Sequence, residues 1–301
     1  MNNPPDWLWI VFTLAAAVVQ TGRIAMQLEL TASLGTIGAT HVRFLFGLPF
    51  SCLYVVLAAL LLREPLPLPT GPALAWIAAA AISQCIGTAL MLASMRDRSF
   101  VVTTALIKIE PVWVALMGVI LLGEVVSFAA GVAILIATAG VLMVSWPRDG
   151  ELEPGTAWKS AALGLAGGAF FGFTSIGYRA GIGELGAASY LVGAITALFV
   201  ALFAQTLLMT VYIHLRERHT LVKIARAWRP SLVAGFMGSA ASQFYFLAFA
   251  LQSAALVRTL ALIEILLAFA VARNLWRQKV TLREVVGIAL LVAGVVVVIN
   301  G

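Results

Sequence analysis

Long apolar runs follow one another along the chain, separated by short polar segments. Ten of these runs are long enough for an α-helix to cross a hydrocarbon core about 30 Å thick, which takes about 20 residues. We therefore expect an all-α integral membrane protein with ten transmembrane helices. The pattern places them at about 7–28, 36–62, 72–94, 100–121, 127–146, 158–181, 187–213, 228–251, 254–274 and 281–300.

The longest polar stretch near the middle of the chain runs from Trp146 to Gly155 and contains both Pro and Gly. Such a stretch is typical of a linker. It leaves five predicted helices on each side. The sequence therefore predicts a first five-helix repeat at 1–147, a linker at 148–157 and a second five-helix repeat at 158–301.

The two halves are similar at a constant offset of 154 residues. Ile109-Glu110 aligns with Ile263-Glu264, and the segment Ala133 to Gly140 aligns with Gly287 to Gly294. Two copies of a five-helix unit in one chain must cross the membrane in opposite senses, because five is odd. The expected fold class is thus two inverted five-helix repeats, a construction common among secondary transporters.

Composition supports lipid as the solvent. Hydrophobic residues make up 62% of the 301 residues and charged residues only 11%, and the mean hydropathy is +1.02. The net charge of +6 comes from basic residues scattered between apolar runs, so a nucleic-acid partner is not expected. Both cysteines, Cys52 and Cys85, fall inside apolar runs, so no disulfide scaffold is indicated.

Lys and Arg are distributed unevenly over the predicted loops. Thirteen of the 19 lie in or beside the loops after the third, fifth, seventh and ninth helices, and only Arg63 and Arg179 lie in the opposite set. Loops rich in Lys and Arg stay on the cytoplasmic side. This rule places both termini outside.

Five charged residues fall deep inside predicted helices. A charge at the bilayer centre is costly, so such residues face a cavity or a partner and are site candidates by default. A structural ion pair or a snorkelling side chain is the alternative for each. The five are Arg23, Lys108, Glu110, Arg258 and Glu264.

Uncharged polar side chains inside the helices complete the set of candidates for substrate binding or coupling. Gln84 follows Ser83 and Gln243 follows Ser242, each in the third helix of its half. Interhelical hydrogen bonding is the alternative role. The uncharged candidates are Gln20, Gln84, Gln243, Tyr178 and Tyr245.

The deep charges also suggest a substrate class. The basic residues outnumber the two acids, because Arg43 adds to the three basic candidates, and a water-poor cavity with that imbalance favours a carboxylate-bearing substrate such as an amino acid. A carboxyl group partly removed from water holds its proton more readily. Glu110 and Glu264 have no counter-ion on the same face of their own helix, so protons are a candidate coupling ion.

Motifs for chemistry are missing from the chain. His41, His214 and His219 show no metal-binding spacing, and neither a GxSxG elbow nor a Walker P-loop occurs. We therefore expect no catalytic residue, no metal and no cofactor, and transport driven by a gradient rather than by ATP. A membrane enzyme or scaffold without transport, and a channel, are the alternative functions.

Two further segments have expected structures. The glycines between Gly164 and Gly172 predict close helix packing. The segment Arg216 to Pro230 carries apolar residues at helical spacing among basic ones; a solvated loop is the favoured interpretation, and a short amphipathic helix along the headgroups is the alternative.

A family resemblance rests on the segment Thr103 to Glu124, TTALIKIEPVWVALMGVILLGE, followed by Gly131 and Gly140. Its Glu110-Pro111 pair and closing Leu-Gly-Glu are similar to the fourth helix of the ten-helix EamA-like members of the drug/metabolite transporter superfamily. The segment Ser253 to Gln278 is similar to the equivalent part of the second repeat. It departs from the pattern in that Ile265 follows Glu264 and no Leu-Gly-Glu closes it.

The resemblance implies a function and a location. It implies a secondary transporter, an exporter or exchanger of a small metabolite, working by alternating access with a cavity formed by helices 1 to 4 and 6 to 9. It also implies a bacterial cytoplasmic membrane and termini on the inside, opposite to the orientation from the charge count. The oligomeric state is left open.

Overall fold

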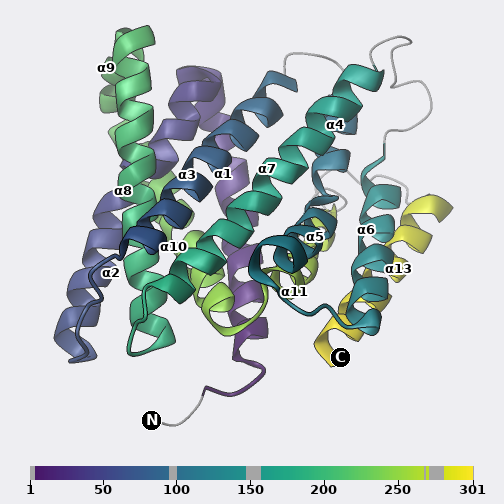
Figure 1. Ribbon diagram of the computed structural model, residues 1–301. Helices are drawn as coiled ribbons and strands as arrows, with labels where there is room; N and C mark the ends of the chain where they lie inside the picture. The colour runs from purple at the N-terminus through teal and green to yellow at the C-terminus, as the bar shows by residue number, and fades with distance from the viewer. Residues whose placement is uncertain (1–3, 95–99, 147–156, 268, 271–280, 301) are drawn as a thin grey trace. The chain divides into compact units, whose positions relative to one another are not determined.

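A computed structural model describes residues 4–94, 100–146, 157–267, 269–270 and 281–300. Every regular element in these ranges is an α-helix, as the apolar pattern predicts. The helices of the first half are α1 (Leu8–Leu45), α2 (Leu48–Leu61), α3 (Gly71–Ser94), α4 (Phe100–Ile107), α5 (Glu110–Leu122) and α6 (Phe128–Ser145). Those of the second half are α7 (Ala157–Glu184), α8 (Tyr190–Arg216), α9 (Arg218–Arg226), α10 (Trp228–Leu251), α11 (Ala254–Ala261) and α13 (Leu282–Asn300) (Figure 1).

Several of these helices are suited to a bilayer. Within the described ranges, eight stretches are long and apolar enough to cross a membrane, and Leu8–Arg23 is a shorter apolar helix. Large apolar side chains such as Leu60, Ile120 and Leu135 lie on the exterior, where lipid can cover them. The chain is therefore a multi-pass membrane protein, and ten as the number of crossings stays a prediction. The eight stretches are Ser33–Leu61, Gly71–Met91, Ala105–Leu122, Phe128–Ser145, Ala161–Glu184, Tyr190–Arg216, Trp228–Leu251 and Leu282–Asn300.

The chain between the first two predicted helices is helical rather than a loop. Helix α1 continues past residue 28 and is interrupted only at Gly35, whose φ of 72° and ψ of 172° are not helical. A positive φ is a conformation that glycine adopts without steric cost. Leu30 and Leu34 are buried in a cluster with Ile224 and Ala234, and this packing keeps the polar segment before Gly35 helical.

The segment Arg216 to Pro230 is also more ordered than expected. It forms helix α9, so the favoured interpretation as a solvated loop is wrong and the alternative of a short helix is right about its structure. Thr220 and Ile224, one turn apart, are buried, and the intervening Lys223 is exposed. The segment is therefore helical because its buried side packs against α1.

The described chain clusters into two compact units. Unit 1 contains residues 1–82 and 177–251, and unit 2 contains 83–176 and 252–301. Each unit takes segments from both sequence halves, and the boundaries fall inside α3, inside α7 and between α10 and α11. Residues 147–156, nearly all of the predicted linker, lie outside the described residues, and α7 begins at Ala157. The division into two sequence repeats stays a prediction.

Helices α6 and α13 of unit 2 pack side by side so closely that their backbones approach each other. A Cβ on Gly140 would lie 2.6 Å from the carbonyl oxygen of Gly287, and one on Gly294 would lie 2.7 Å from that of Ala133. The offset of 154 makes Gly140 equivalent to Gly294 and Ala133 equivalent to Gly287. The two contacts are therefore reciprocal, as they are across a two-fold axis.

Candidate functional site

Two helix breaks define the candidate site, and both lie in unit 2. Helix α4 ends at Ile107 and α5 begins at Glu110, while α11 ends at Ala261 and the backbone is helical again from Glu264. The breaks at 108–109 and 262–263 are separated by the same 154 residues that relate the two halves. Each break therefore places a glutamate as the first residue of the helical segment that follows it.

The backbone at both breaks changes from i→i−4 to i→i−3 hydrogen bonding. The amides of Lys108 and Ile109 bond to the carbonyls of Ala105 and Leu106, and the amides of residues 262 and 263 bond in the same way to those of residues 259 and 260. Pro111 lies in the first turn of α5, a position that proline favours. Ile265 occupies the equivalent place in the second half, so a proline is not required for the break.

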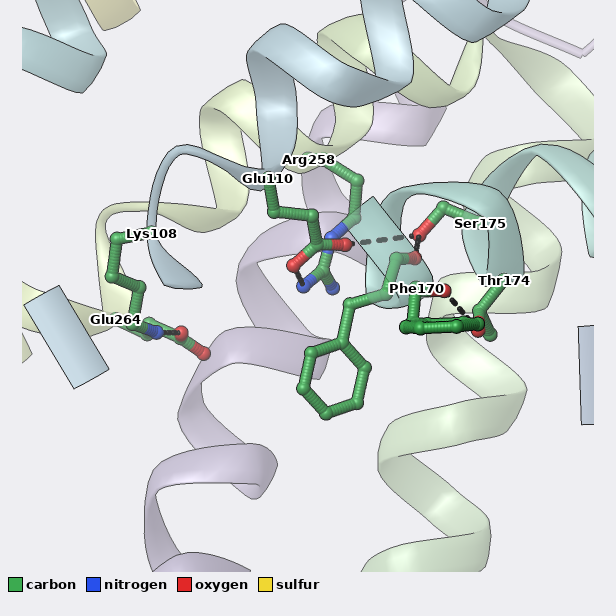
Figure 2. A network of polar contacts seen from close by, with 8 residues as sticks. Lys108, Glu110, Phe170, Thr174, Ser175, Arg258 and Glu264 are labelled. Atoms are coloured by element: carbon green, nitrogen blue, oxygen red, sulfur yellow. Dashed lines mark hydrogen bonds and ion pairs between the residues drawn. The ribbon is translucent and has the colours of Figure 1, made fainter. Parts of the chain in front are cut away.

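Each glutamate forms an ion pair with a basic residue from the other half of the sequence. Arg258 Nη2 of α11 lies 2.5 Å from Glu110 Oε2 of α5. Lys108 pairs in turn with Glu264. Figure 2 shows both pairs at the broken helices. The pairs are crossed, because neither glutamate binds the basic residue nearest to it in the sequence.

A serine from a third helix supports Glu110. Ser175 of α7 donates a hydrogen bond of 3.1 Å to Glu110 Oε1 (Figure 2). Helix α7 approaches closely because it presents glycines there: a Cβ on Gly168 would lie 3.2 Å from the Ile107 carbonyl oxygen, and one on Gly172 would lie 2.9 Å from Trp113 Cβ. The glycine cluster thus packs closely, as predicted.

Exposure differs between the acid and the base of each pair. The side chains of Glu110 and Glu264 are 8% and 12% exposed, whereas those of Arg258 and Lys108 are 20% and 29% exposed. A buried charge that loses its partner costs several kcal/mol, so the acids depend on the bases for stability. The bases are therefore the more accessible members of the two pairs.

The sequence candidates divide between the two units. Unit 2 holds the two ion pairs and Gln84, which follows Ser83; the Ser83 hydroxyl donates to the Phe170 carbonyl at 2.8 Å. The other five candidates lie in unit 1. They are Gln20, Arg23, Tyr178, Gln243 and Tyr245.

The unit 1 candidates make contacts both within a helix and between helices. Arg23 Nε donates to Gln20 Oε1 at 3.0 Å within α1, and Gln205 Nε2 donates to the Tyr178 hydroxyl at 3.0 Å. Tyr245 is buried beside Phe249. Gln243 differs, because its buried amide nitrogen and oxygen have no hydrogen-bond partner among the described residues.

Ser175 is the site residue that the sequence candidates omit. The signal for it in the sequence is the pair Thr174-Ser175 in a stretch, 161–177, otherwise made of small and apolar residues. Serine and threonine often bond to their own helix, and Thr174 does so through the Phe170 carbonyl. The sequence cannot separate Ser175 from such a residue, because the difference lies in the position of Glu110.

Comparison with known proteins identifies the first half of the chain. Residues 7–146 match the model of the EamA-like transporter family. No curated protein matches the chain. A crystal structure, described only as that of a protein, is similar over 96% of this chain and 95% of that one, with a TM-score of 0.67 at 14% identity. At that identity the likeness shows a shared fold alone.

The matched range contains the residues that carry the resemblance in the sequence, namely Glu110-Pro111 and the Leu-Gly-Glu ending at Glu124. The family is one of membrane transporters of the drug/metabolite type, with a bilayer and a small-molecule substrate as its partners. Residues 7–146 thus match the family that the sequence resembles, which confirms the resemblance for this part of the chain.

Proposed function

We propose that the protein is a secondary transporter, an exporter or exchanger, of a small metabolite that bears a carboxylate, with a zwitterionic amino acid as the favoured substrate. The observation that carries the proposal is the crossed arrangement of two ion pairs at two equivalent helix breaks. We place Lys108, Glu110, Arg258 and Glu264 at the substrate and coupling site, in a bacterial cytoplasmic membrane.

The charge balance of the site supports a zwitterion. Its two acids and two bases are already paired, so a substrate with a single charge would leave one residue without a partner in a poorly solvated place. An amino acid carries both charges. Its carboxylate can bind the more exposed Arg258 or Lys108 while its ammonium group binds the glutamate that is released.

Alternating access follows from the proposed repeats. Inverted repeats present the same site to opposite sides when one rocks against the other. The equivalent breaks and the reciprocal contacts of Gly140 and Gly294 are what two-fold related repeats would produce. We include ten crossings and two inverted five-helix repeats, at 1–147 and 158–301, in the proposal.

Substrate binding and flux test the proposal together. The purified protein is screened by thermal unfolding against amino acids, and the hits are then tested for counterflow in proteoliposomes. A ligand that binds only the folded state raises the unfolding midpoint. We expect amino acids to do so and to exchange, and Arg258→Gln to abolish both effects. The control Arg283→Gln removes a half-buried charge near a helix end that donates to the Trp146 carbonyl, away from the proposed site, and should leave both effects unchanged. If carboxylate-free cations alone are exchanged, the substrate class is wrong.

Proton coupling is tested at the glutamates. Opening a pair frees a carboxylate that a proton can neutralise, so Glu110→Gln or Glu264→Gln should abolish uphill transport driven by a pH gradient while exchange stays measurable. If both variants still concentrate substrate at the wild-type rate, neither glutamate is the coupling site.

Orientation is tested by labelling single cysteines. In a background without Cys52 and Cys85, Ala225→Cys and Asn300→Cys both occupy exposed positions. The bias of Lys and Arg places α9 in the cytoplasm and the termini outside. On intact cells an impermeant thiol reagent should then label residue 300 and not 225. The reverse pattern would support termini on the inside, as the family implies.

A further inference from the structure

Helix α9 lies at the membrane surface because of its neighbours in the chain. The apolar span Tyr190–Arg216 ends immediately before it and the span Trp228–Leu251 begins shortly after it. Figure 1 shows α9 at one end of α8. A short helix between two spans on the same side lies at the depth of the lipid headgroups, where amphipathic helices are stable.

The exposed face of this segment is basic. Between residues 216 and 230 the sequence has five Lys and Arg residues and a single acid, Glu217, which accepts a hydrogen bond of 3.2 Å from the Thr220 hydroxyl. The side chains of Lys223, Arg226 and Arg229 are exposed. Basic clusters of this kind beside a bilayer attract anionic lipid headgroups.

An aromatic residue and a groove adjoin the basic face. Trp228 is 50% exposed, and the Arg229 guanidinium lies 5.4 Å from the centre of its ring. Tryptophan is enriched at headgroup level because its ring is amphipathic, so Trp228 suits this depth. An open groove of about 220 Å³ is lined by Met26, Leu30, Ser33 and Pro230. Three of these four residues are apolar, which suits an acyl chain.

We propose that the basic face and this groove together bind one anionic phospholipid of the surrounding bilayer. The phosphate contacts Arg226 and Arg229, and an acyl chain occupies the groove between α1 and the start of α10. The partner is a lipid rather than free phosphate, because the groove beside Arg229 is lined mostly by apolar residues, which a phosphate ion would not use.

The proposed lipid would also act on the bend in α1. Leu30 and Leu34 precede Gly35, Ala39 follows it, and all three belong to the cluster that contains Ile224 of α9. Gly38 of α1 also packs closely against α9, because a Cβ on Gly38 would lie 3.1 Å from Thr220 Cγ2. A lipid held by α9 therefore stabilises the helical segments on both sides of Gly35.

The test compares two lipids that differ only in the headgroup. The purified full chain in neutral detergent receives phosphatidylglycerol or phosphatidylcholine with the same acyl chains, and native mass spectrometry and thermal unfolding report binding and stability. We expect phosphatidylglycerol to be retained and to raise the unfolding midpoint more. Each removed charge should weaken binding about fivefold. Equal binding and equal stabilisation by the two lipids would overturn the proposal.

Variants separate charge from folding and headgroup from acyl chain. Lys223→Gln/Arg226→Gln/Arg229→Gln should lose the preference for phosphatidylglycerol, and Lys223→Arg/Arg226→Lys/Arg229→Lys should keep it. Ser33→Trp, which fills the groove, should weaken lipid binding with all charges in place. If the Gln variant binds as wild type does, or if inorganic phosphate and glycerophosphoglycerol stabilise the protein as well as the lipid does, no lipid site exists here.

Discussion

The two glutamates of the ion pairs in unit 2 occupy equivalent places at the offset of 154 residues, but their basic partners do not, because Lys108 corresponds to Leu262 and Arg258 to Thr104. Glu110 is paired with an arginine, receives a further hydrogen bond from Ser175 and precedes a proline. Glu264 is paired with a lysine that is 29% exposed and precedes Ile265. The backbone breaks match, so the equivalence lies in the main chain while the side chains have diverged. We expect the Glu110 pair to determine stability and the Glu264 pair to open more easily.

The largest expected effect comes from removing Glu110. Glu110→Gln breaks the ion pair between the buried Glu110 and Arg258, and breaking a buried pair by removing one partner costs about 3–5 kcal/mol. Glu264→Gln should cost less, because the more exposed Lys108 can reach water. Thermal and denaturant unfolding of both variants checks the order. Equal losses would mean that the two pairs are equivalent in energy.

A double-mutant cycle measures the Glu110 pair directly. Glu110→Gln/Arg258→Gln removes both charges, so it should be more stable than the sum of the single variants predicts, by about 0.5–3 kcal/mol. The matched cycle on Lys108→Gln/Glu264→Gln should give a smaller coupling energy. Additivity within about 0.5 kcal/mol in the first cycle would show that the pair contributes nothing beyond its separate charges.

The packing of α6 and α13 should show the symmetry that the pairs lack. Gly140→Ala and Gly294→Ala each place a Cβ less than 3 Å from the partner backbone, so each should destabilise the protein by about 1–3 kcal/mol. Gly131→Ala in the same helix α6 is the control, because a Cβ there meets nothing within 4 Å. A neutral effect at 140 and a large one at 294 would argue against reciprocal contacts.

The smallest expected effect isolates the hydrogen bond from Ser175 to Glu110. Ser175→Ala should cost about 0.5–1.5 kcal/mol, because the Ser175 hydroxyl lies 3.1 Å from Glu110 Oε1 but also 3.3 Å from the Phe171 carbonyl of its own helix. Thr174→Ala is the control on the neighbouring residue, since its hydroxyl bonds only to the Phe170 carbonyl of its own helix among the contacts drawn in Figure 2. If the Thr174 variant is the less stable one, the Ser175 contact does not distinguish the two pairs.

The lengths of the apolar runs were enough to predict the membrane helices, because the length of an apolar segment determines whether it can cross a bilayer. They placed α3, α6 and α8 within a few residues of their observed bounds. They missed the helical residues before Gly35 and favoured a loop for α9. In both places a polar segment becomes helical because Leu30, Leu34 and Ile224 pack together, and such packing between distant segments leaves no local signal.

The four residues of the two ion pairs were among the sequence candidates, but their pairing was not predicted. Lys108, Glu110, Arg258 and Glu264 were chosen because a charge deep in a membrane helix is costly and needs a partner or a cavity. The expectation from helix geometry assumed continuous helices, whereas both helices are broken between the basic residue and the glutamate. The counter-ions that the structure shows come from about 150 positions away, so no spacing rule could name them. The helix breaks were also missed, because only one of them has a proline.

Crossed pairing has a consequence for how the chain is made. Arg258 lies 148 positions after Glu110 and Glu264 lies 156 after Lys108. At a synthesis rate of about 5–20 residues per second, Glu110 and Lys108 wait roughly 7–30 s before their partners leave the ribosome. During that interval Lys108 and Glu110 lack the partners that they have in the folded protein. The fourth helix of the nascent first half must be shielded by the insertion machinery or stay at the water boundary until the second half arrives.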